Sequence, residues 1–372
     1  MEKRKSLPRK PWSFLAYIAG DNNLSDAGLE DISEMCQIGA SKNVHAAVQI
    51  DTEGDFEGVV RYEITEPDPT GTAHRTVIAR LPELDSGDPK TLRGSLKWGF
   101  ARYPARKRVV VVWNHGAGFR TRLPRRDIAY DDSGTALDMN EIDTVFQAAG
   151  VGPQNRISIL GFDACLMNMV EIVHHLRRRA EYIVGSEQTE PGDGWPYDEV
   201  LALLNRNEGV STTARKIVSH YIASYRKVGE QNVTQSAVET AKTESVMAAL
   251  SKLGKALAAS LPASRSAVRM IRTLVQSYEY ADYVDLGHLC TLLKKSKIKG
   301  VKSAASSVAT RVQTAVIFNG RYGSGVGHSS GLSVWFPAEP HLYLNFRAKY
   351  VAMDFYKHHT GWVSFLDRYH SS

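Results

Sequence analysis

Hydrophobic residues over the first 240 positions form short continuous runs separated by segments of helical spacing. The continuous runs are rich in β-branched residues, which predicts strands covered on both faces. They lie at 14–20, 44–51, 108–113, 156–162, 182–186 and 233–238. Helices are predicted between them at 25–38, 91–103, 135–148 and 210–228, and a hairpin at 59–64 and 75–79. This alternation predicts a doubly wound, mainly parallel α/β sheet flanked by helices.

The pattern changes near residue 241 and becomes almost wholly helical and rich in Ala, Ser and Lys. Four helices are predicted, at 243–259, 264–280, 283–294 and 300–313. Strand patterns return near 315–318 and 332–336. We therefore expect an α/β domain over 1–240, with a disordered basic segment at 1–11, and a helical C-terminal addition over 241–372 whose two strands return to the core.

Composition limits the classes of partner. The net charge of +6 comes partly from basic clusters in the first ten residues, at 177–179 and at 294–299. No aromatic interleaving accompanies these clusters, so we read them as solvated surface and expect no nucleic-acid partner. No run approaches the 18 apolar residues of a membrane span. The chain is accordingly expected not to associate with membranes. We also expect a monomer, although nothing in the composition determines the oligomeric state.

Two further features bear on the compartment. The apolar run at 14–19 leads directly into Gly20 and Asp21, which predicts a strand and not a signal peptide. The three cysteines are far apart and match neither a disulfide framework nor a zinc motif; they are Cys36, Cys165 and Cys290. The sequence therefore predicts a cytoplasmic location.

Cys165 occupies the junction between the strand pattern at 156–162 and the helical spacing that begins at Leu166. It is therefore predicted to lie on the first turn of a helix. Unpaired N–H groups and the positive end of the helix dipole favour a thiolate there, which is the form that attacks carbonyl groups. The alternative role is that of a buried packing cysteine.

A candidate base follows the strand at 108–113, which ends in Asn114, His115 and Gly116. The carboxyl ends of parallel strands form the ligand-binding edge of an α/β sheet, so base and nucleophile should meet there. Gly116 would let the backbone approach a substrate oxygen, and the N–H groups of Gly116 and Cys165 are candidates for an oxyanion hole. Four other histidines could compete as the base, but none of them ends a buried parallel strand; they are His45, His74, His288 and His328. His328 lies in a glycine-rich loop and stays a candidate.

Seven short motifs, in this order along the chain, resemble the clostripain family of cysteine peptidases. They are Ala19-Gly-Asp-Asn-Asn-Leu24, Trp113-Asn-His-Gly-Ala-Gly118, Asp131-Asp-Ser-Gly134, Gly161-Phe-Asp-Ala-Cys-Leu-Met167, Gly185-Ser-Glu187, Gly194-Trp-Pro-Tyr197 and Gly331-Leu-Ser-Val-Trp-Phe-Pro337. The resemblance implies a caspase-like fold, a Cys165–His115 dyad, and cleavage of peptides after arginine or lysine. The separation of about 50 residues between His115 and Cys165 also matches caspases.

The resemblance implies further site residues. Asp163 takes the place of the carboxylate at the base of the S1 pocket, which binds a cationic P1 side chain. A helix N-cap is the alternative role for Asp163. Asp193 is a second acidic candidate for this pocket, Trp195 would shape it, and Asn22 could supply a wall.

The stretch 119–130 contains four arginines and a proline and is predicted to be an exposed loop. Relatives in the family mature by cleavage between the histidine and cysteine segments, which implies a zymogen that processes itself after Arg122, Arg125 or Arg126. No cofactor is required by a Cys–His dyad. Calcium, which some relatives need, could bind acidic residues that follow this stretch, although a solvated acidic loop is the plainer reading; they are Asp127, Asp131 and Asp132.

Two other classes compete with a peptidase. One is an inactive scaffold of the same fold. The other is an α/β protein whose loop at 320–331 or basic clusters bind a phosphorylated ligand, although that loop lacks the Gly-Lys-Ser/Thr of a P-loop. Reaction of Cys165 with an arginine-directed alkylating agent would distinguish all three.

Overall fold

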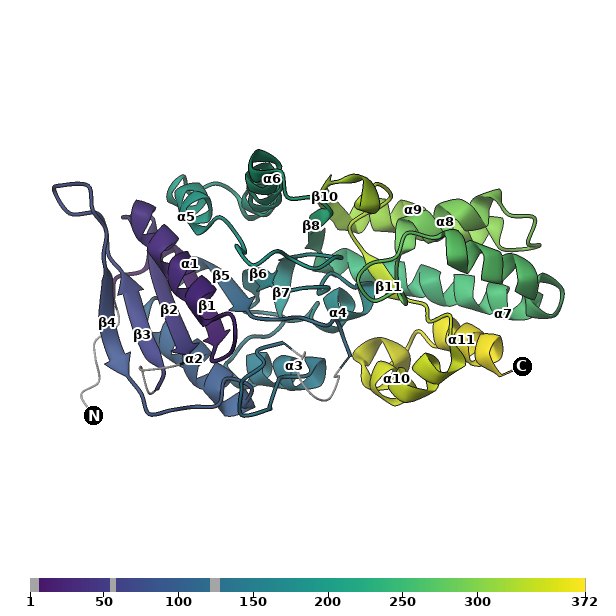
Figure 1. Cartoon of the computed structure of the whole chain (residues 1–372), viewed down its shortest axis with the longest axis horizontal. Coiled ribbons are helices and arrows are strands. Elements are labelled where there is room, and N and C mark those ends of the chain that lie inside the picture. Colours follow the sequence, from purple (N-terminus) through teal and green to yellow (C-terminus); the bar gives the residue numbers. More distant parts are fainter. Residues whose placement is uncertain (1–6, 54–57, 121–127, 372) are drawn as a thin grey trace.

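The computed structural model describes residues 7–53, 58–120 and 128–371. Its centre is a nine-stranded sheet of order β10-β8-β7-β6-β5-β1-β2-β3-β4, seen at the left of Figure 1. The five central strands run parallel and the outer ones antiparallel. This confirms the predicted doubly wound sheet. The strands are β1 (Lys10–Gly20), β2 (Val44–Thr52), β3 (Val60–Ile64), β4 (Arg75–Arg80), β5 (Ala105–Trp113), β6 (Ile157–Asp163), β7 (Ala180–Gly185), β8 (Val233–Glu239) and β10 (Val316–Tyr322).

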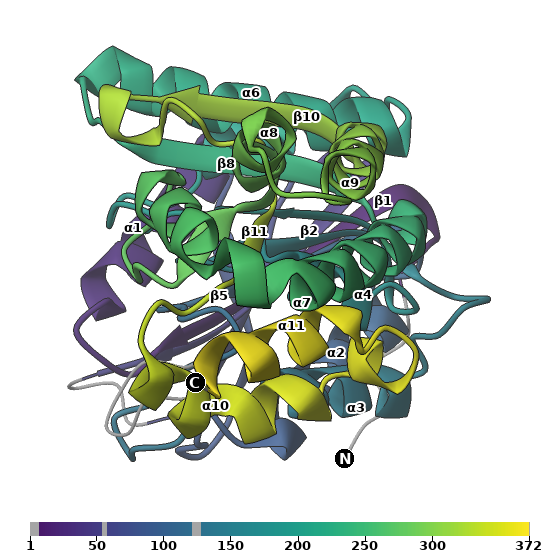
Figure 2. The ribbon, with the colours of Figure 1, turned by 90° about the vertical axis from the view of Figure 1, so that its right-hand side faces the viewer.

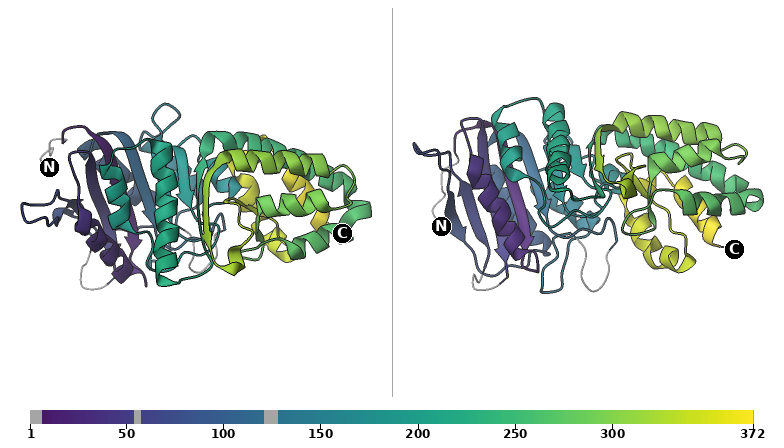
Figure 3. Two further views of the ribbon diagram at one scale, coloured as in Figure 1. Left: turned by 90° about the horizontal axis from the view of Figure 1, so that it is seen from above. Right: turned by 45° about the horizontal axis from the view of Figure 1, so that its top comes forward.

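Helices cover both faces because successive side chains of a buried strand point to opposite sides. In β1, Phe14 and Ile18 belong to the core beneath α1 (Ser25–Ile38), α5 (Tyr197–Asn205) and α6 (Val210–Val228). Leu15 and Tyr17 belong to the opposite core, beneath α2 (Pro89–Arg102), α3 (Met139–Ala148) and α4 (Val170–His175). Figure 3 shows these layers from two further directions.

The C-terminal helices pack beside the sheet, at the right of Figure 1 and toward the viewer in Figure 2. They are α7 (Thr243–Leu274), α8 (Leu286–Lys295), α9 (Lys302–Ala315), α10 (Pro340–Ala352) and α11 (Gly361–His370). The sequence predicted a break near residue 260, but α7 is one helix with Pro262 inside it. Proline cannot donate to the carbonyl of Ala258, and Arg368 of α11 donates to that carbonyl instead, at 3.4 Å.

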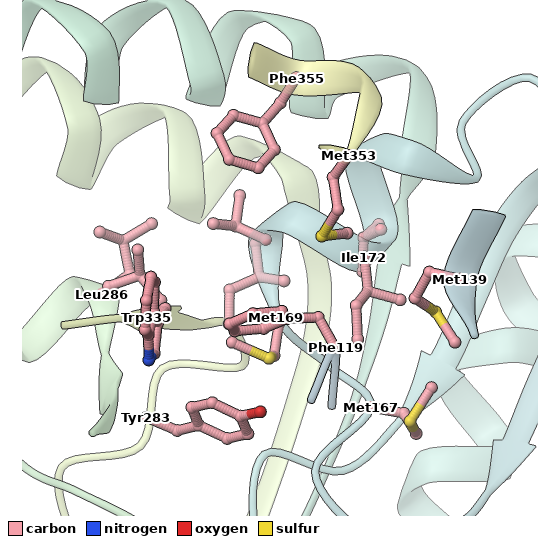
Figure 4. Close-up of a cluster of buried hydrophobic side chains, with 14 of the residues drawn as sticks. Phe119, Met139, Met167, Met169, Ile172, Tyr283, Leu286, Trp335, Met353 and Phe355 are labelled. Carbon is pink, nitrogen blue, oxygen red and sulfur yellow. The ribbon is translucent and has the colours of Figure 1, made fainter. Parts of the chain in front are cut away.

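The two predicted regions share one core. β10 lies beyond residue 241, yet it pairs with β8 and completes the large sheet. β11 (Ser333–Trp335) instead pairs with β9 (Tyr283–Asp285) in a separate two-stranded sheet. Figure 4 shows the hydrophobic contact between the regions, where side chains from both sides interleave: Phe119, Met167, Met169 and Ile172 from one, and Tyr283, Leu286, Trp335 and Phe355 from the other.

Some surface predictions need correction. β1 already begins at Lys10, so the predicted disordered segment 1–11 extends too far; residues 1–6 lie outside the described part. The cluster at 177–179 is not simply solvated, because Arg179 is buried and pairs with Asp143, at 2.7 Å. None of the helices in the described residues has the length and apolarity needed to cross a bilayer.

Candidate active site

Cys165 lies at the predicted edge of the sheet but not on a helix. β6 ends at Asp163, Cys165 follows in a turn, and Leu166 has a left-handed backbone with φ of 65°. α4 begins only at Val170. The helix dipole therefore cannot act on the thiol as the sequence predicted, and the groups around the turn must do so instead.

The backbones that carry His115 and Cys165 are in direct contact. β5 pairs with β6 so that Trp113 lies opposite Asp163, and the Asn114 N–H donates to the Asp163 carbonyl at 3.2 Å. A Cβ atom at Gly116 would come within 2.3 Å of the Cys165 carbonyl oxygen. Only glycine allows this approach. The structure thus places the two candidate residues on adjacent strand ends, as parallel pairing predicts.

A pocket of about 150 Å³ opens at this edge. Both candidate residues line it, together with Leu24, Asp163, Glu190 and Gly194. The Nε2 atom of His115 lies 2.9 Å from the side-chain oxygen of Asn23. Asn23 follows β1, the strand next to β5, and the sequence analysis did not assign it a role. An amide oxygen at this distance can fix the orientation of the imidazole ring.

Glu190 is the second residue that the sequence analysis missed. Its main-chain N–H donates to the Sγ atom of Cys165 at 3.3 Å. A donor on the sulfur stabilises a thiolate, so this contact takes the place of the predicted helix dipole. The carboxyl oxygens of Glu190 are buried. The one sequence feature that could have pointed to Glu190 is its position in the loop after β7, which lies at the same edge of the sheet.

Asp163 is buried beneath the pocket. Its carboxylate accepts hydrogen bonds from the Tyr197 hydroxyl at 2.7 Å and from the Trp195 N–H at 3.2 Å. Burial raises the pKa of Asp163 to about 6, although these bonds act in the opposite direction. Asp163 does not cap a helix, since the residue before α4 is Met169.

Asp163 and Glu190 form an acidic pair. Burial, together with the charge of Asp163, raises the pKa of Glu190 well above its ordinary value. Two neighbouring carboxyl groups in such a site favour the state in which one is ionised and the other protonated. We therefore expect the two carboxyl groups to share one negative charge and one proton.

Three predicted pocket residues do not line the pocket. Trp195 is fully buried against Gly161 in the core beneath α5 and α6; its backbone reaches Asp163, and its side chain interacts with the carboxyl group of Glu190. Asp193 is exposed and does not line the pocket. Asn22 is buried and donates from Nδ2 to the carbonyls of Ala19 and Tyr130, at 3.0 and 2.9 Å. Asn22 holds two strand-end loops together and is not a pocket wall.

The C-terminal region supports the loop that carries Glu190. Glu187 accepts a hydrogen bond from the Gly331 N–H at 2.9 Å, and the side-chain oxygen of Gln188 accepts one from the Glu279 N–H at 2.9 Å. Asp285 caps α8 and accepts a hydrogen bond from the Ser330 hydroxyl at 2.9 Å. The glycine-rich stretch before β11 is thereby a fixed support of the site.

The arginine-rich stretch is only partly described. Arg122, Arg125, Arg126 and Asp127 lie outside the described residues. Arg120 was expected to be exposed, but it is 2% exposed and forms an ion pair with Asp282, which is equally buried. The two carboxylate oxygens of Asp131 accept hydrogen bonds from the N–H groups of Ser86 and Ser133, at 2.8 and 2.9 Å. Calcium binding by Asp127, Asp131 and Asp132 stays a prediction.

A thiol, an imidazole and an acidic pocket at the carboxyl edge of a doubly wound sheet define the class of cysteine hydrolases with a caspase-like fold. Residues 16–369 match the model of the clostripain family, peptidase C11. The chain therefore belongs to the clostripain family of cysteine proteases.

Individual relatives agree with this assignment. The chain is 26% identical over 228 residues to clostripain from Hathewaya histolytica, a match that covers 54% of this chain and 43% of that protein. The chain thus matches less than half the length of this relative. The fold is similar to that of a secreted C11 cysteine protease from Bacteroides thetaiotaomicron in complex with an irreversible peptide inhibitor, with a TM-score of 0.71, 23% identity, and coverage of 93% of this chain and 99% of the other.

A second solved structure is that of an inactive zymogen C11 protease from Parabacteroides distasonis, with a TM-score of 0.74, 18% identity, and coverage of 94% and 98%. The secreted relative contradicts the cytoplasmic location predicted from the sequence. That prediction relied on the scarcity of cysteines. A chain with a core this large needs no disulfides, so their absence does not identify the compartment.

Proposed function

We propose that the chain is an endopeptidase that cleaves after arginine or lysine, with Cys165 as nucleophile and His115 as base. The observation that carries the proposal is the buried carboxyl pair, Asp163 and Glu190, in the same pocket as the thiol and the imidazole. A peptide whose P1 side chain enters this pocket brings its carbonyl carbon to the rim, where Cys165 and His115 lie.

The proposed chemistry follows the usual order for a thiol nucleophile. His115 takes the proton of Cys165, and Sγ attacks the carbonyl carbon. The N–H groups of Gly116 and Cys165 stabilise the oxyanion; the close approach of these two backbone segments supports this assignment. His115 then protonates the leaving amine, and water attacks the acyl-enzyme with His115 as base. Asn23 holds the imidazole in position through its 2.9 Å contact.

The acidic pair supports a preference for a cationic P1 residue. An arginine guanidinium offers a planar fork of donors that matches one or two carboxylates, and a lysine ammonium offers a point charge. Entry of either cation favours the ionised form of both carboxyl groups, so binding releases the shared proton. An apolar P1 residue would leave a buried negative charge without a cationic partner and is therefore disfavoured.

We also propose that the chain matures by cutting itself within the arginine-rich stretch. Arg120 is protected, because its guanidinium is buried with Asp282. Arg122, Arg125 and Arg126 are then the candidate sites, in the segment that links the strand of His115 to the strand of Cys165. Self-cleavage there requires the same preference for arginine that the pocket supports.

The decisive experiment compares two alkylating agents on the full chain. An arginine chloromethyl ketone should inactivate it much faster than iodoacetamide and should modify Cys165, as mapped by mass spectrometry. A peptide library should show cleavage after arginine or lysine. Equal, slow reaction with both agents would identify an inactive scaffold, and cleavage after aspartate or large apolar residues would refute the pocket assignment.

A further inference from the structure

A second group of titratable side chains gathers around α4, the helix that follows the turn of Cys165. The carboxylate of Glu244, at the start of α7, lies between two histidines. Its oxygens are 2.9 Å from Nε2 of His174 in α4 and 2.7 Å from Nε2 of His359, which precedes α11. Three segments that are far apart in sequence thus converge on one point.

The three groups have the spacing and the chemistry of a metal-binding site. Their ligand atoms all lie within 4.8 Å of one another, and among the described residues this is the one group of three such side chains. Both histidines are buried, whereas the side chain of Glu244 is 51% exposed. Ligands in a four-coordinate site at bonds of about 2.0–2.1 Å are roughly 3.3 Å apart. Small side-chain rotations would therefore suffice.

The charges around the group also permit a cation. The guanidinium of Arg177 is 3.4 Å from Glu244 but is held by Asp354, at 2.7 Å. Its charge is therefore partly balanced.

We propose that His174, Glu244 and His359 bind a divalent transition ion, with Zn²⁺ as the best match and water as the fourth ligand. Two imidazoles and one carboxylate are typical ligands of Zn²⁺, whereas Ca²⁺ prefers oxygen ligands only. The exposed side of Glu244 leaves room for the water. On binding, the proton on each Nε2 would move to Nδ1 of the same ring, so that two neutral imidazoles bind the ion through Nε2. At His174 this requires Nη1 of Arg177, which is 3.4 Å from Nδ1, to turn away. The ion would fasten α4, α7 and the segment before α11 to one another.

This site would act on stability and not on chemistry, and it does not depend on the proposed function. α4 begins at Val170, shortly after Cys165, so a metal here would stiffen the support of the catalytic turn without touching substrate. Without metal, the same residues form a hydrogen-bonded cluster in which both histidines donate to Glu244. Direct measurement of metal binding distinguishes these two states.

The test uses the full-length Cys165→Ala variant, which removes the active-site thiol as a competing ligand. After treatment with EDTA, thermal unfolding is followed with Zn²⁺, with Ca²⁺ and without metal. Zn²⁺ should raise the Tm by about 3 °C when its free concentration is roughly a hundredfold above its dissociation constant. Ca²⁺ should not. Co²⁺ should give the visible d–d absorption of a tetrahedral site without sulfur-to-metal charge transfer.

Substitutions locate the ion. Glu244→Ala and His359→Ala should abolish the Zn²⁺ shift, and His358→Ala, at an exposed neighbouring histidine, should retain it. Absence of a Zn²⁺ shift in the Cys165→Ala chain would overturn the proposal, as would an equal shift in Glu244→Ala. Sulfur-to-metal charge transfer in the Co²⁺ spectrum would place the ion on Cys36 or Cys290. That spectrum decides the question even if the histidine variants fold poorly.

Discussion

The main-chain N–H of Glu190 donates to the Sγ atom of Cys165 at 3.3 Å, while the carboxyl group of the same residue is buried beside Asp163. One residue therefore contacts the candidate nucleophile through its backbone and the specificity pocket through its side chain. A cation that draws the Glu190 side chain toward itself would also adjust the donor on the sulfur.

Asp163→Asn should lower kcat/KM for arginine substrates by about 10- to 100-fold, which corresponds to the loss of one charged hydrogen bond of about 1.5–3 kcal/mol. Glu190→Gln should act in the same direction. Steady-state kinetics with an arginine peptide measure both effects, and Asp193→Asn serves as the control because Asp193 is exposed outside the pocket. An unchanged kcat/KM in Asp163→Asn would exclude this carboxylate from P1 recognition.

The activity should depend on pH through Asp163. Its pKa in the free enzyme is raised to about 6, so the group is ionised above this pH and neutral below it. The attraction for a cationic P1 side chain is therefore lost as the pH falls. For arginine peptides, kcat/KM should decrease up to about tenfold per pH unit below 6 from this cause. The ratio of wild type to Asp163→Asn should shrink over the same range; a constant ratio would argue against the assignment.

Cys165→Ala and His115→Ala should each abolish turnover while circular dichroism shows an unchanged fold. Asn23→Ala should lower kcat about tenfold with little change in KM, because Asn23 touches the imidazole and not the substrate. Asn23→Asp should restore part of the loss, since it keeps an acceptor oxygen. A change confined to KM would show that Asn23 binds substrate instead.

Asp31→Asn should stabilise the protein at neutral pH. Asp31 is 3% exposed, and burial followed by the charge of Asp163 raises its pKa to about 10. The folded chain keeps this proton, whereas the unfolded chain loses it above a pH of about 4, so ionisation favours unfolding as the pH rises. The gain from Asn should be about 1–3 kcal/mol at pH 7 and should vanish near pH 4.

Urea unfolding at both pH values, with Cys165→Ala as the parent, measures this difference. Glu30→Gln, which removes an exposed acid on the same helix, is the matched control. The charge of Glu30 is the smallest cause of the raised pKa of Asp31, so this variant should give only a small part of the effect. Destabilisation by Asp31→Asn at pH 7 would mean that the carboxylate is ionised in the fold.

Self-processing predicts two fragments, of roughly one third and two thirds of the chain, produced by cleavage after Arg122, Arg125 or Arg126. Mass spectrometry of the purified wild type, during incubation beside Cys165→Ala, should show fragments only in the wild type. Replacement of all three arginines by glutamine should keep the chain intact. Equal cutting in both proteins would point to a contaminating protease.

The strand pattern predicted the sheet well because buried parallel strands are continuous apolar runs, as in β5 and β6. The spacing of apolar residues gave a wrong prediction just after Cys165, where it indicated a helix. Leu166, Met169 and Val173 have helical spacing, yet a turn with a left-handed residue followed by a short helix buries them equally well. The spacing of apolar residues shows which side chains are buried, but it does not show where a turn interrupts a helix.

The candidate site shows a similar limit. His115 and Cys165 could be predicted because strand ends converge by topology. Asn23 and Glu190 could not, since their contacts depend on the conformation of two loops. Trp195 was expected to shape the pocket because its loop follows a strand end at this edge. Its indole is fully buried under Gly161 and acts on the pocket through the carboxyl group of Glu190.

The order of the strands determines how a cut in the arginine-rich stretch would divide the sheet. A cut between β5 and β6 leaves β5-β1-β2-β3-β4 on one fragment and β6-β7-β8-β10 on the other, each an unbroken half-sheet. The two halves would meet at a single seam, and His115 and Cys165 lie on opposite sides of it. The matured protein would thus be a heterodimer in which neither subunit holds a complete catalytic pair, so subunit association and catalytic competence would be one and the same equilibrium.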